Sequence, residues 1–203
     1  MIAVLDYGIG NLRSAQKGLE KVGADARLPA DADVVAAADG VVLPGVGAFG
    51  RCMEALRESK LEGPARDAID AGVPFLGICV GMQMLYEGAE EDPGVPGMGV
   101  LGGKVRRLPD GVKRPQMQWN RLDRVGDSPM FAGLEDPTWV YFVHSFAPEP
   151  TAEVVSTCEY GGPVVAAVQR GNLWATQFHP EKSSAAGLRL LANFAVAAGA
   201  ATG

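Results

Sequence analysis

Short apolar runs with almost no charge recur through the first half of the chain. They are "IAVLD" at residues 2–6, "GVVLPG" at 40–45 and "VPFLGI" at 73–78. Runs of this length and composition are typical of strands that are buried on both faces of a sheet. Because helical segments separate these runs, the pattern predicts a parallel, doubly wound α/β sheet flanked by helices.

Three segments in the same half have the signals of helices. Over residues 12–22, apolar side chains recur at helical spacing, Asn11 is a helix-capping residue type and Gly23 can end the helix. A second helix is predicted over 64–71, and a third over 81–89, directly after the third apolar run. Helices in these places carry the chain back across the sheet, as parallel strands require.

The second half changes to a pattern of many short strands. After a turn-rich connection, the predicted strands are 104–108, 117–125, 138–146, 152–160, 163–170 and 173–178. Gly161-Gly162 and Gly171-Asn172 are two-residue hairpin signals, so this half should be mostly antiparallel. With a last helix over about 185–198, we expect one domain over residues 1–203: a parallel core with an antiparallel extension.

Composition and charge narrow the class of protein. The 203 residues are 47% hydrophobic and 21% charged, which is typical of a globular domain, and the net charge of −6 argues against nucleic acid as the main partner. No run approaches the roughly 20 apolar residues of a membrane helix. The cysteines Cys52, Cys79 and Cys158 are too widely spaced for a disulfide framework or a zinc site. We therefore expect a cytoplasmic protein without a metal or another cofactor.

One cysteine has the surroundings of a nucleophile. Gly77, Cys79 and Gly81 have the spacing of a sharp strand-to-helix elbow, which lifts the side chain out of the end of the sheet. A helix N-terminus at this point lowers the pKa of a thiol, and the amide of Val80 is placed to stabilise an oxyanion. The alternative is a buried structural cysteine.

The base for such a nucleophile must come from the chain's two histidines. In "FHPEK", Pro180 pushes His179 toward an extended conformation, in which residues two apart point the same way. Glu181 can then orient the imidazole of His179 and support its positive charge. The alternative is a histidine at a strand end beside a solvated glutamate. The other histidine, His144, alternates with Phe142, and we interpret it as a packed, hydrogen-bonded residue.

A glycine-rich loop, "PGVGAFG" at residues 44–50, follows the second predicted strand. It should end at the same sheet edge as Cys79, where ligands of parallel sheets bind. Gly45 and Gly47 leave the peptide at Val46 free to adopt unusual dihedral angles, so that a backbone N–H there can be the second oxyanion donor. An ordinary tight turn is the alternative. Cys52 and Cys158 lack such surroundings and are interpreted as packing residues.

These motifs resemble those of the class I glutamine amidotransferases. Within that family, the chain is most similar to the branch that serves as glutaminase of imidazole glycerol phosphate synthase. The stretches that carry the resemblance are "LDYGIGNLRS", "PGVGAFG", "GICVGMQ", "MQWN", "YFVHSF" and "FHPEKS", spread over nearly the whole chain. The resemblance implies the family's flavodoxin-like sheet, glutamine as substrate, and a heterodimer with a (β/α)8 cyclase, with no role for nucleic acid or a membrane.

The resemblance also implies roles for single residues. Cys79 is implied as the nucleophile, His179 as the base and Glu181 as the residue that orients it. The residues implied to bind glutamine are Gly47, Gln83 and Ser145, and those implied to face the cyclase are Trp119, Asn120 and Tyr141. The family usually has His-Met-Gly-Trp-Asn where this chain has Gln116-Met117-Gln118-Trp119-Asn120, so we expect an altered loop shape there.

Three other functions compete with this interpretation. The chain can be a cysteine peptidase or a deglycase on a similar sheet, a regulatory subunit without activity, or the glutaminase of a different synthase. The His-Pro-Glu spacing and Gln83 argue against the first, and the complete set of Cys79, His179 and Glu181 argues against the second. The basic stretch at 104–114 is interpreted as a solvated hairpin rather than a docking surface.

Overall fold

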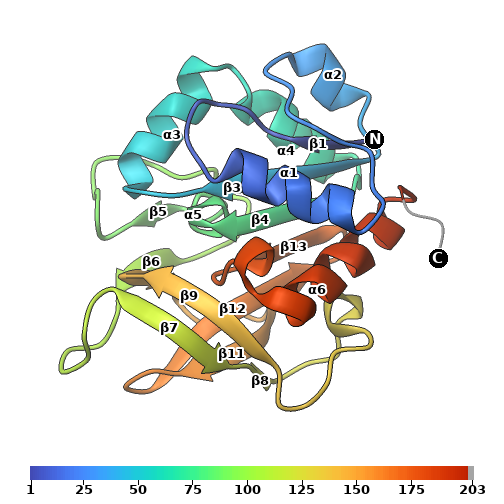
Figure 1. Cartoon of the computed structure of the whole chain (residues 1–203). Helices are drawn as coiled ribbons and strands as arrows, with labels where there is room; N and C mark the ends of the chain where they lie inside the picture. The colour runs from blue at the N-terminus through green and yellow to red at the C-terminus, as the bar shows by residue number, and fades with distance from the viewer. Residues whose placement is uncertain (201–203) are drawn as a thin grey trace.

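A computed structural model describes residues 1–200, and its centre is an eight-stranded sheet with the order β2-β1-β3-β4-β13-β12-β11-β8 (Figure 1). Its parallel strands are β2 (Ala26–Arg27), β1 (Ile2–Val4), β3 (Gly40–Gly45), β4 (Phe75–Cys79) and β13 (Leu173–Thr176). Its antiparallel strands are β12 (Pro163–Arg170), β11 (Val154–Glu159) and β8 (Asp123–Arg124). The predicted parallel core with an antiparallel extension is therefore confirmed.

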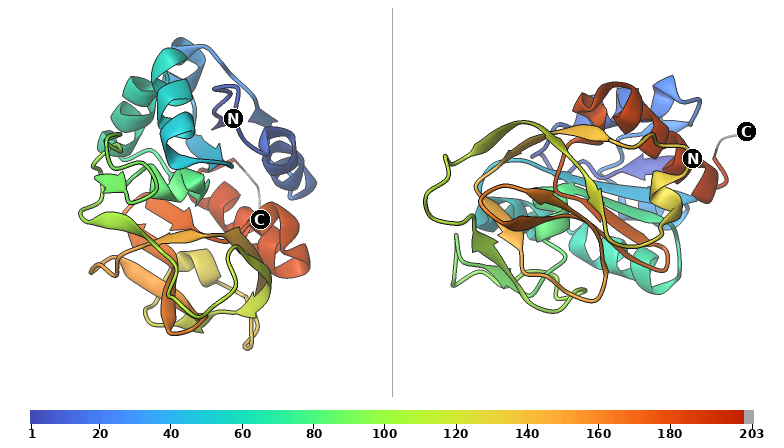
Figure 2. Two further views of the ribbon diagram at one scale, coloured as in Figure 1. Left: turned by 90° about the vertical axis from the view of Figure 1, so that its left-hand side faces the viewer. Right: turned by 90° about the horizontal axis from the view of Figure 1, so that it is seen from below.

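Helices cover both faces of the parallel strands. The helices are α1 (Leu12–Lys21), α2 (Ala32–Ala36), α3 (Phe49–Glu58), α4 (Glu62–Asp70), α5 (Val80–Gln83) and α6 (Ser184–Ala197), with short 3-10 turns η1 (Pro129–Phe131) and η2 (Pro180–Lys182). Helices α1 and α6 pack together on one face, and α3 and α4 lie on the other (Figure 2). Among residues 1–200, no helix combines the length and the apolar character that a bilayer span requires.

Two smaller sheets complete the second half. One has the order β10-β6-β5 and consists of β10 (Phe146–Pro148), β6 (Lys104–Arg107) and β5 (Gly88–Ala89). The other pairs β7 (Gln116–Arg121) antiparallel with β9 (Trp139–His144). Burial alternates along β9, so that Val140, Phe142 and His144 face inward. Residues 116–120, where we expected a loop of altered shape, form a paired strand instead, in which Gln118 lies opposite Phe142.

The third predicted helix, over 81–89, is wrong beyond its first turn. Helix α5 ends at Gln83, and the chain turns toward β5. The reason is tertiary: the backbone N–H groups of residues 97, 98, 99 and 101 donate to the carbonyls of residues 84–87, at distances of 2.8 to 3.0 Å. Because those carbonyls already have partners, and Met84 through Tyr86 are fully buried, the segment does not continue as a helix with one exposed face.

Candidate active site

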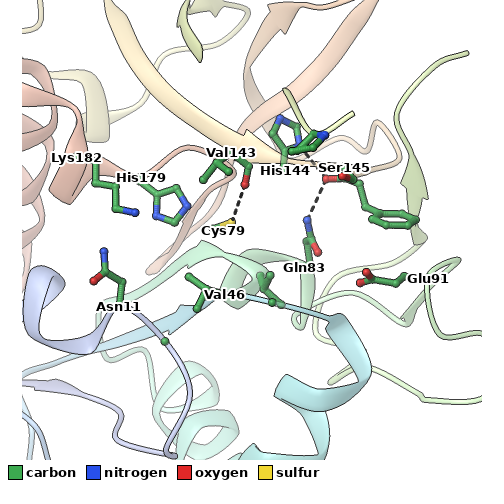
Figure 3. Close-up of a pocket in the computed structure, with 15 residues that line it drawn as sticks. Asn11, Val46, Cys79, Gln83, Glu91, Val143, His144, Ser145, His179 and Lys182 are labelled. Atoms are coloured by element: carbon green, nitrogen blue, oxygen red, sulfur yellow. Dashed lines mark hydrogen bonds between the residues drawn. The ribbon is translucent and has the colours of Figure 1, made fainter. Parts of the chain in front are cut away.

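The predicted site residues gather at one end of the parallel sheet. Cys79 is the last residue of β4, the glycine-rich loop follows β3, and His179 comes shortly after β13. Because β4 is parallel to both of its neighbours, these three ends meet at the same edge. They line a cavity of about 540 Å³, a size typical of small-ligand sites (Figure 3).

The backbone at Cys79 has the strained geometry of a nucleophile elbow. Cys79 has φ +55° and ψ −112°, a conformation that L-residues rarely adopt. A Cβ added to Gly81 would lie 1.8 Å from the Leu43 carbonyl oxygen, and one added to Gly77 would lie 3.0 Å from the Gly81 carbonyl oxygen. The two glycines are therefore required because the turn packs directly on its neighbours, as the sequence predicts.

The thiol of Cys79 is buried but opens to the cavity, with 3% of the residue exposed. Its Sγ lies 3.9 Å from the Val143 carbonyl oxygen and 3.7 Å from Nε2 of Gln177, which donates to it. Helix α5 behind it has only four residues, so its dipole is small. The other group that bears on the thiol is His179, which lines the same cavity.

His179 and Glu181 form a close, buried pair. The imidazole Nδ1 lies 2.8 Å from Oε1 of Glu181, and only 1% of each side chain is exposed. The predicted proximity is confirmed, and His179 is extended, as predicted. The chain does not stay extended through Glu181, however: Pro180 starts the 3-10 turn η2, which brings the Glu181 carboxylate to the ring. Asn11, expected to cap α1, makes no side-chain cap bond; its Nδ2 donates to Oε1 of Glu181 at 3.2 Å.

The surroundings of His179 favour a charged imidazole with one reactive nitrogen. Burial disfavours that charge, but the neighbouring Cys79 and Glu181 outweigh burial and raise the pKa of His179 to about 10. Its Nε2 is buried and has no hydrogen-bond partner in the part of the chain that the structure describes. Since Nδ1 is held by Glu181, Nε2 is the atom that can exchange a proton with a group in the cavity.

Both predicted oxyanion residues line the cavity beside Cys79. Val80 follows Cys79 directly, and Val46 belongs to the loop after β3 (Figure 3). Gly47 has φ +92°, a conformation that favours glycine, although a Cβ there would meet no atom within 4 Å. The glycine at position 47 is therefore needed for its backbone conformation rather than for space.

The residues expected to bind substrate line another wall of the cavity. The Gln83 Nε2 donates to the Phe146 carbonyl and to Oε1 of Gln177, both at 3.0 Å. Its N–H groups are thus engaged within the protein, and its Oε1 is the atom available to a ligand. Ser145 lines the cavity as well, while its carbonyl accepts from the Leu108 N–H at 2.9 Å.

Two charged residues of the cavity are absent from the sequence-based prediction. Glu91 lines the wall on the Gln83 side and accepts from the Phe49 N–H at 2.9 Å, and Lys182 lies near His179 (Figure 3). The only signal for Glu91 is the acidic stretch Glu90-Glu91-Asp92, which also fits an exposed turn. Lys182 directly follows Glu181, but its position in the chain does not tell whether its side chain faces the cavity.

His144 is packed and hydrogen-bonded, as predicted. Its Nδ1 lies 2.8 Å from the Phe146 carbonyl oxygen and its Nε2 lies 2.8 Å from Oε1 of Gln116. Burial lowers the pKa of His144 to about 4. Although it also lines the cavity, both of its ring nitrogens face oxygen atoms of the protein, so neither is directed at a ligand.

The residues expected to face a partner lie outside the cavity, on the β7–β9 sheet. Trp119 is 45% exposed and meets Tyr141 edge-on, with ring centroids 6.2 Å apart. Met117 and Trp139 are exposed on the same two strands. Asn120 instead uses its Nδ2 to donate to the Glu159 carbonyl at 2.9 Å, so that group already has a partner in the protein.

Neither a metal cluster nor a disulfide is present among residues 1–200. No group of three or more His, Cys, Asp or Glu side chains is placed there to hold a metal ion. Cys52, Cys79 and Cys158 are free and buried in this part of the chain.

Sequence comparisons identify relatives of nearly the same length. The model of the family described as glutamine amidotransferase class I matches residues 3–198. The imidazole glycerol phosphate synthase subunit HisH of Deinococcus radiodurans is 49% identical over 197 residues, covering 95% of this chain and 92% of that protein. The protein of the same name from Rhodopirellula baltica is 50% identical over 201 residues, covering 97% of this chain and 98% of that protein.

Solved structures with lower sequence identity have the same fold. The crystal structure of a glutamine amidotransferase matches with a TM-score of 0.77 at 23% identity, and covers 98% of both chains. The structure of PurLQS from Thermotoga maritima matches with a TM-score of 0.74 at 20% identity, covering 95% of this chain and 96% of that one.

Proposed function

Because the chain belongs to the class I glutamine amidotransferases, we propose that Cys79, His179 and Glu181 are the residues that hydrolyse glutamine. The chain is the glutaminase subunit of an imidazole glycerol phosphate synthase, since relatives of that name match nearly its whole length at 49% and 50% identity. As one subunit of a synthase, it takes glutamine as substrate and works with a partner subunit.

The first half of the reaction forms a thioester. The Cys79 thiolate attacks the side-chain amide carbon of glutamine, and the N–H groups of Val46 and Val80 stabilise the oxyanion that results. Nε2 of the His179 imidazolium gives its proton to the leaving nitrogen. Ammonia departs as the C–N bond breaks, and a glutamyl thioester remains on Cys79.

The second half releases glutamate. The neutral His179 takes a proton from water, and the hydroxide adds to the thioester carbon. The tetrahedral intermediate expels the Cys79 thiolate, so glutamate leaves and the imidazolium–thiolate pair is restored. Glu181 holds Nδ1 throughout, which keeps Nε2 directed at the reacting atoms and stabilises the charged ring.

Charged and polar groups away from the thiol suit the amino-acid end of glutamine. The Glu91 carboxylate lines the wall beside Gln83, where it can pair with the α-ammonium group, and Gly47, Gln83 and Ser145 supply further polar contacts. If Glu91 binds the ammonium group in both ground and transition states, Glu91→Gln raises KM about tenfold and changes kcat much less. Steady-state glutaminase kinetics measure both constants.

The observation that carries this proposal is the placement of a strained, buried Cys79 beside a His179–Glu181 pair in one cavity. The test is Cys79→Ala, assayed in the complex for glutamine-dependent and ammonium-dependent product formation. We expect the first to be lost and the second to be kept, because added ammonium bypasses the glutaminase. Full glutamine-dependent activity in Cys79→Ala would exclude Cys79 as the nucleophile.

We further propose the nature of the partner. It is a (β/α)8 cyclase that receives the ammonia and forms imidazole glycerol phosphate and an aminoimidazole carboxamide ribotide. The exposed aromatic residues Trp119 and Tyr141, together with Asn120, form the docking surface in this proposal; the exposure of Trp119 and its contact with Tyr141 support it. Co-purification of the two subunits, with and without Trp119→Ala, tests this assignment.

We also propose how the chain is divided into domains and where in the cell it lies. We propose that residues 1–203 form one glutamine amidotransferase domain, and the sheet that joins strands from both halves of the chain supports this. We place the protein in the cytoplasm, where a reducing environment suits its three free thiols.

A further inference from the structure

A fully buried glutamine, Gln177, contacts both the nucleophile and a residue expected to bind substrate. Its Oε1 accepts from Nε2 of Gln83 at 3.0 Å, and its Nε2 donates to Sγ of Cys79 at 3.7 Å. Cys79 and Gln83 line the cavity, whereas Gln177 has no exposed surface and lies behind them. Because Gln177 is shielded from water, its amide depends on these two neighbours for its hydrogen bonds.

The backbone at Gln177 is held by the central sheet. Gln177 directly follows β13, and its N–H donates to the Ala166 carbonyl of β12 at 2.8 Å. The next residue, Phe178, is fully buried and meets Phe142 edge-on, with ring centroids 5.7 Å apart. His179 follows, so one short stretch supplies both Gln177 and the proposed base. The amide of Gln177 is thus presented from a tightly packed part of the fold.

The direction of the Gln177 amide follows from a backbone carbonyl. The Phe146 carbonyl can only accept a hydrogen bond, so the atom of the Gln83 side chain that lies 3.0 Å from it must be the nitrogen. The second hydrogen of that nitrogen is directed at Gln177, whose facing atom must then be its oxygen. The N–H group of Gln177 is therefore the end that faces Cys79.

The contacts of the Cys79 sulfur favour different protonation states. The Val143 carbonyl oxygen, 3.9 Å away, can only accept, so it interacts favourably with the neutral thiol and not with a thiolate. The N–H of Gln177 is a donor, and it binds a thiolate more strongly than a thiol because hydrogen bonds to charged acceptors are stronger. Negative charge is on the sulfur before attack and returns when the thioester breaks down, so Gln177 acts at both of these points.

We propose that Gln177 is a further catalytic residue, which stabilises the Cys79 thiolate through its N–H and holds the Gln83 amide through its oxygen. In this arrangement, Gln83 is left with its Oε1 to offer a ligand. One buried amide thus connects the nucleophile to the wall that binds substrate. This inference rests on the proposed function, since it assumes that Cys79 attacks glutamine as a thiolate.

The test replaces the Gln177 amide in two ways. Gln177→Met is similar in size and removes both the donor and the acceptor, so we expect kcat for glutamine hydrolysis to fall about tenfold and KM to rise about fivefold. Gln177→Glu retains an oxygen for Gln83 but loses the donor and adds a negative charge beside the sulfur. Its KM should therefore stay within about twofold of wild type, while its kcat falls at least as far as in Gln177→Met.

Alkylation of the thiol reports its charge independently of turnover. With iodoacetamide over a range of pH and mass spectrometry of the Cys79 peptide, both variants should need a higher pH than wild type to reach the same alkylation rate, because alkylation requires the thiolate. The matched control is Gln116→Met, since Gln116 is also fully buried and its Nε2 lies 3.9 Å from the sulfur of a different cysteine, Cys158. We expect wild-type kinetics and wild-type alkylation of Cys79 in that variant.

All variants are measured in the complex, with ammonium-dependent activity and thermal unfolding as checks on folding. Wild-type kcat and alkylation in Gln177→Met would overturn the inference, as would equal losses in Gln116→Met, or a KM that rises as far in Gln177→Glu as in Gln177→Met. The proposed function fails separately, if Cys79→Ala stays active. Should Gln177→Met not fold, Gln177→Glu decides the question by its own kcat, KM and alkylation.

Discussion

The surroundings of the two histidines differ, although both rings are buried and both line the same cavity. His179 has a carboxylate on Nδ1 and a thiol nearby, and its Nε2 has no partner. His144 has neutral oxygens beside both ring nitrogens, those of Phe146 and Gln116. Burial opposes a charge on each ring, and only His179 has neighbours that outweigh it, so one pKa is raised and the other lowered.

The difference shows that burial alone does not decide what a histidine can do. A ring buried among neutral groups is fixed and uncharged, which suits a packed core. A ring with one nitrogen held by a carboxylate and the other directed into a cavity is oriented, charged and able to transfer a proton. The same residue type therefore has a structural role at position 144 and, in our proposal, a catalytic role at position 179.

Replacing each histidine in turn should show the largest difference in activity between the two positions. His179→Ala should lower glutamine-dependent turnover by about a thousandfold or more, because no other group replaces the proton carrier. Ammonium-dependent synthesis by the complex should persist and serves as the control for folding. Glutaminase assays on His179→Ala and His144→Gln side by side make the comparison, and similar losses in both variants would contradict it.

A smaller effect is expected when the partner of the His179 ring is changed. Glu181→Gln keeps the shape and a hydrogen-bonding group but removes the negative charge, so turnover should fall by about 10- to 100-fold, less than in His179→Ala. The ring is then less able to hold a proton, and the pH dependence of kcat should shift to lower pH. Kinetics identical to wild type would mean that Glu181 has no part in orienting or charging His179.

The smallest effect on activity, but a distinct one on stability, is expected at His144. Its folded-state pKa of about 4 lies below the ordinary value, so the unfolded chain takes up a proton first as the pH falls. The stabilisation from a neutral His144 is complete above about pH 6.5 and is lost as the pH falls toward 4. Between pH 7 and pH 5, the contribution of His144 to the free energy of unfolding falls by about 2 kcal/mol. His179 has the opposite sign, since its raised pKa stabilises the fold at low pH and loses this effect toward pH 10.

Thermal or chemical unfolding of wild type and His144→Gln at both pH values measures this contribution, because the other titrating groups are common to the two proteins. The variant should lose about 2 kcal/mol less on acidification than wild type, with kcat within about threefold. An equal loss of stability in both proteins would show that His144 is not held neutral by its surroundings.

The sequence was sufficient for those parts of the site that depend on neighbouring residues. The elbow at Cys79 follows from flanking glycines, and the proximity of His179 and Glu181 follows from a spacing of two residues around a proline. The fold was predictable for a similar reason, since the buried strands are short apolar runs and the hairpins have Gly-Gly and Gly-Asn at their turns.

Features that depend on distant parts of the chain were not predictable in this way. Asn11 has the residue type of a helix cap, but it binds Glu181, which is 170 positions away. Glu91 enters the site because its carboxylate reaches the Phe49 N–H at the start of α3. Helix α5 ends early because residues 97–101 occupy the carbonyls that follow it. In each case the deciding partner is brought in by the fold, and no local pattern indicates it.

The most direct test of the account is to trap the covalent intermediate. Wild-type complex is mixed with glutamine, quenched in acid during turnover, digested and analysed by mass spectrometry, with Cys79→Ala and Cys158→Ala treated alike. We predict a glutamyl adduct on the peptide that contains Cys79 in wild type and Cys158→Ala, and none in Cys79→Ala. A glutamyl adduct at another residue, or turnover of glutamine by Cys79→Ala, would contradict the assignment of Cys79 as the nucleophile beside His179.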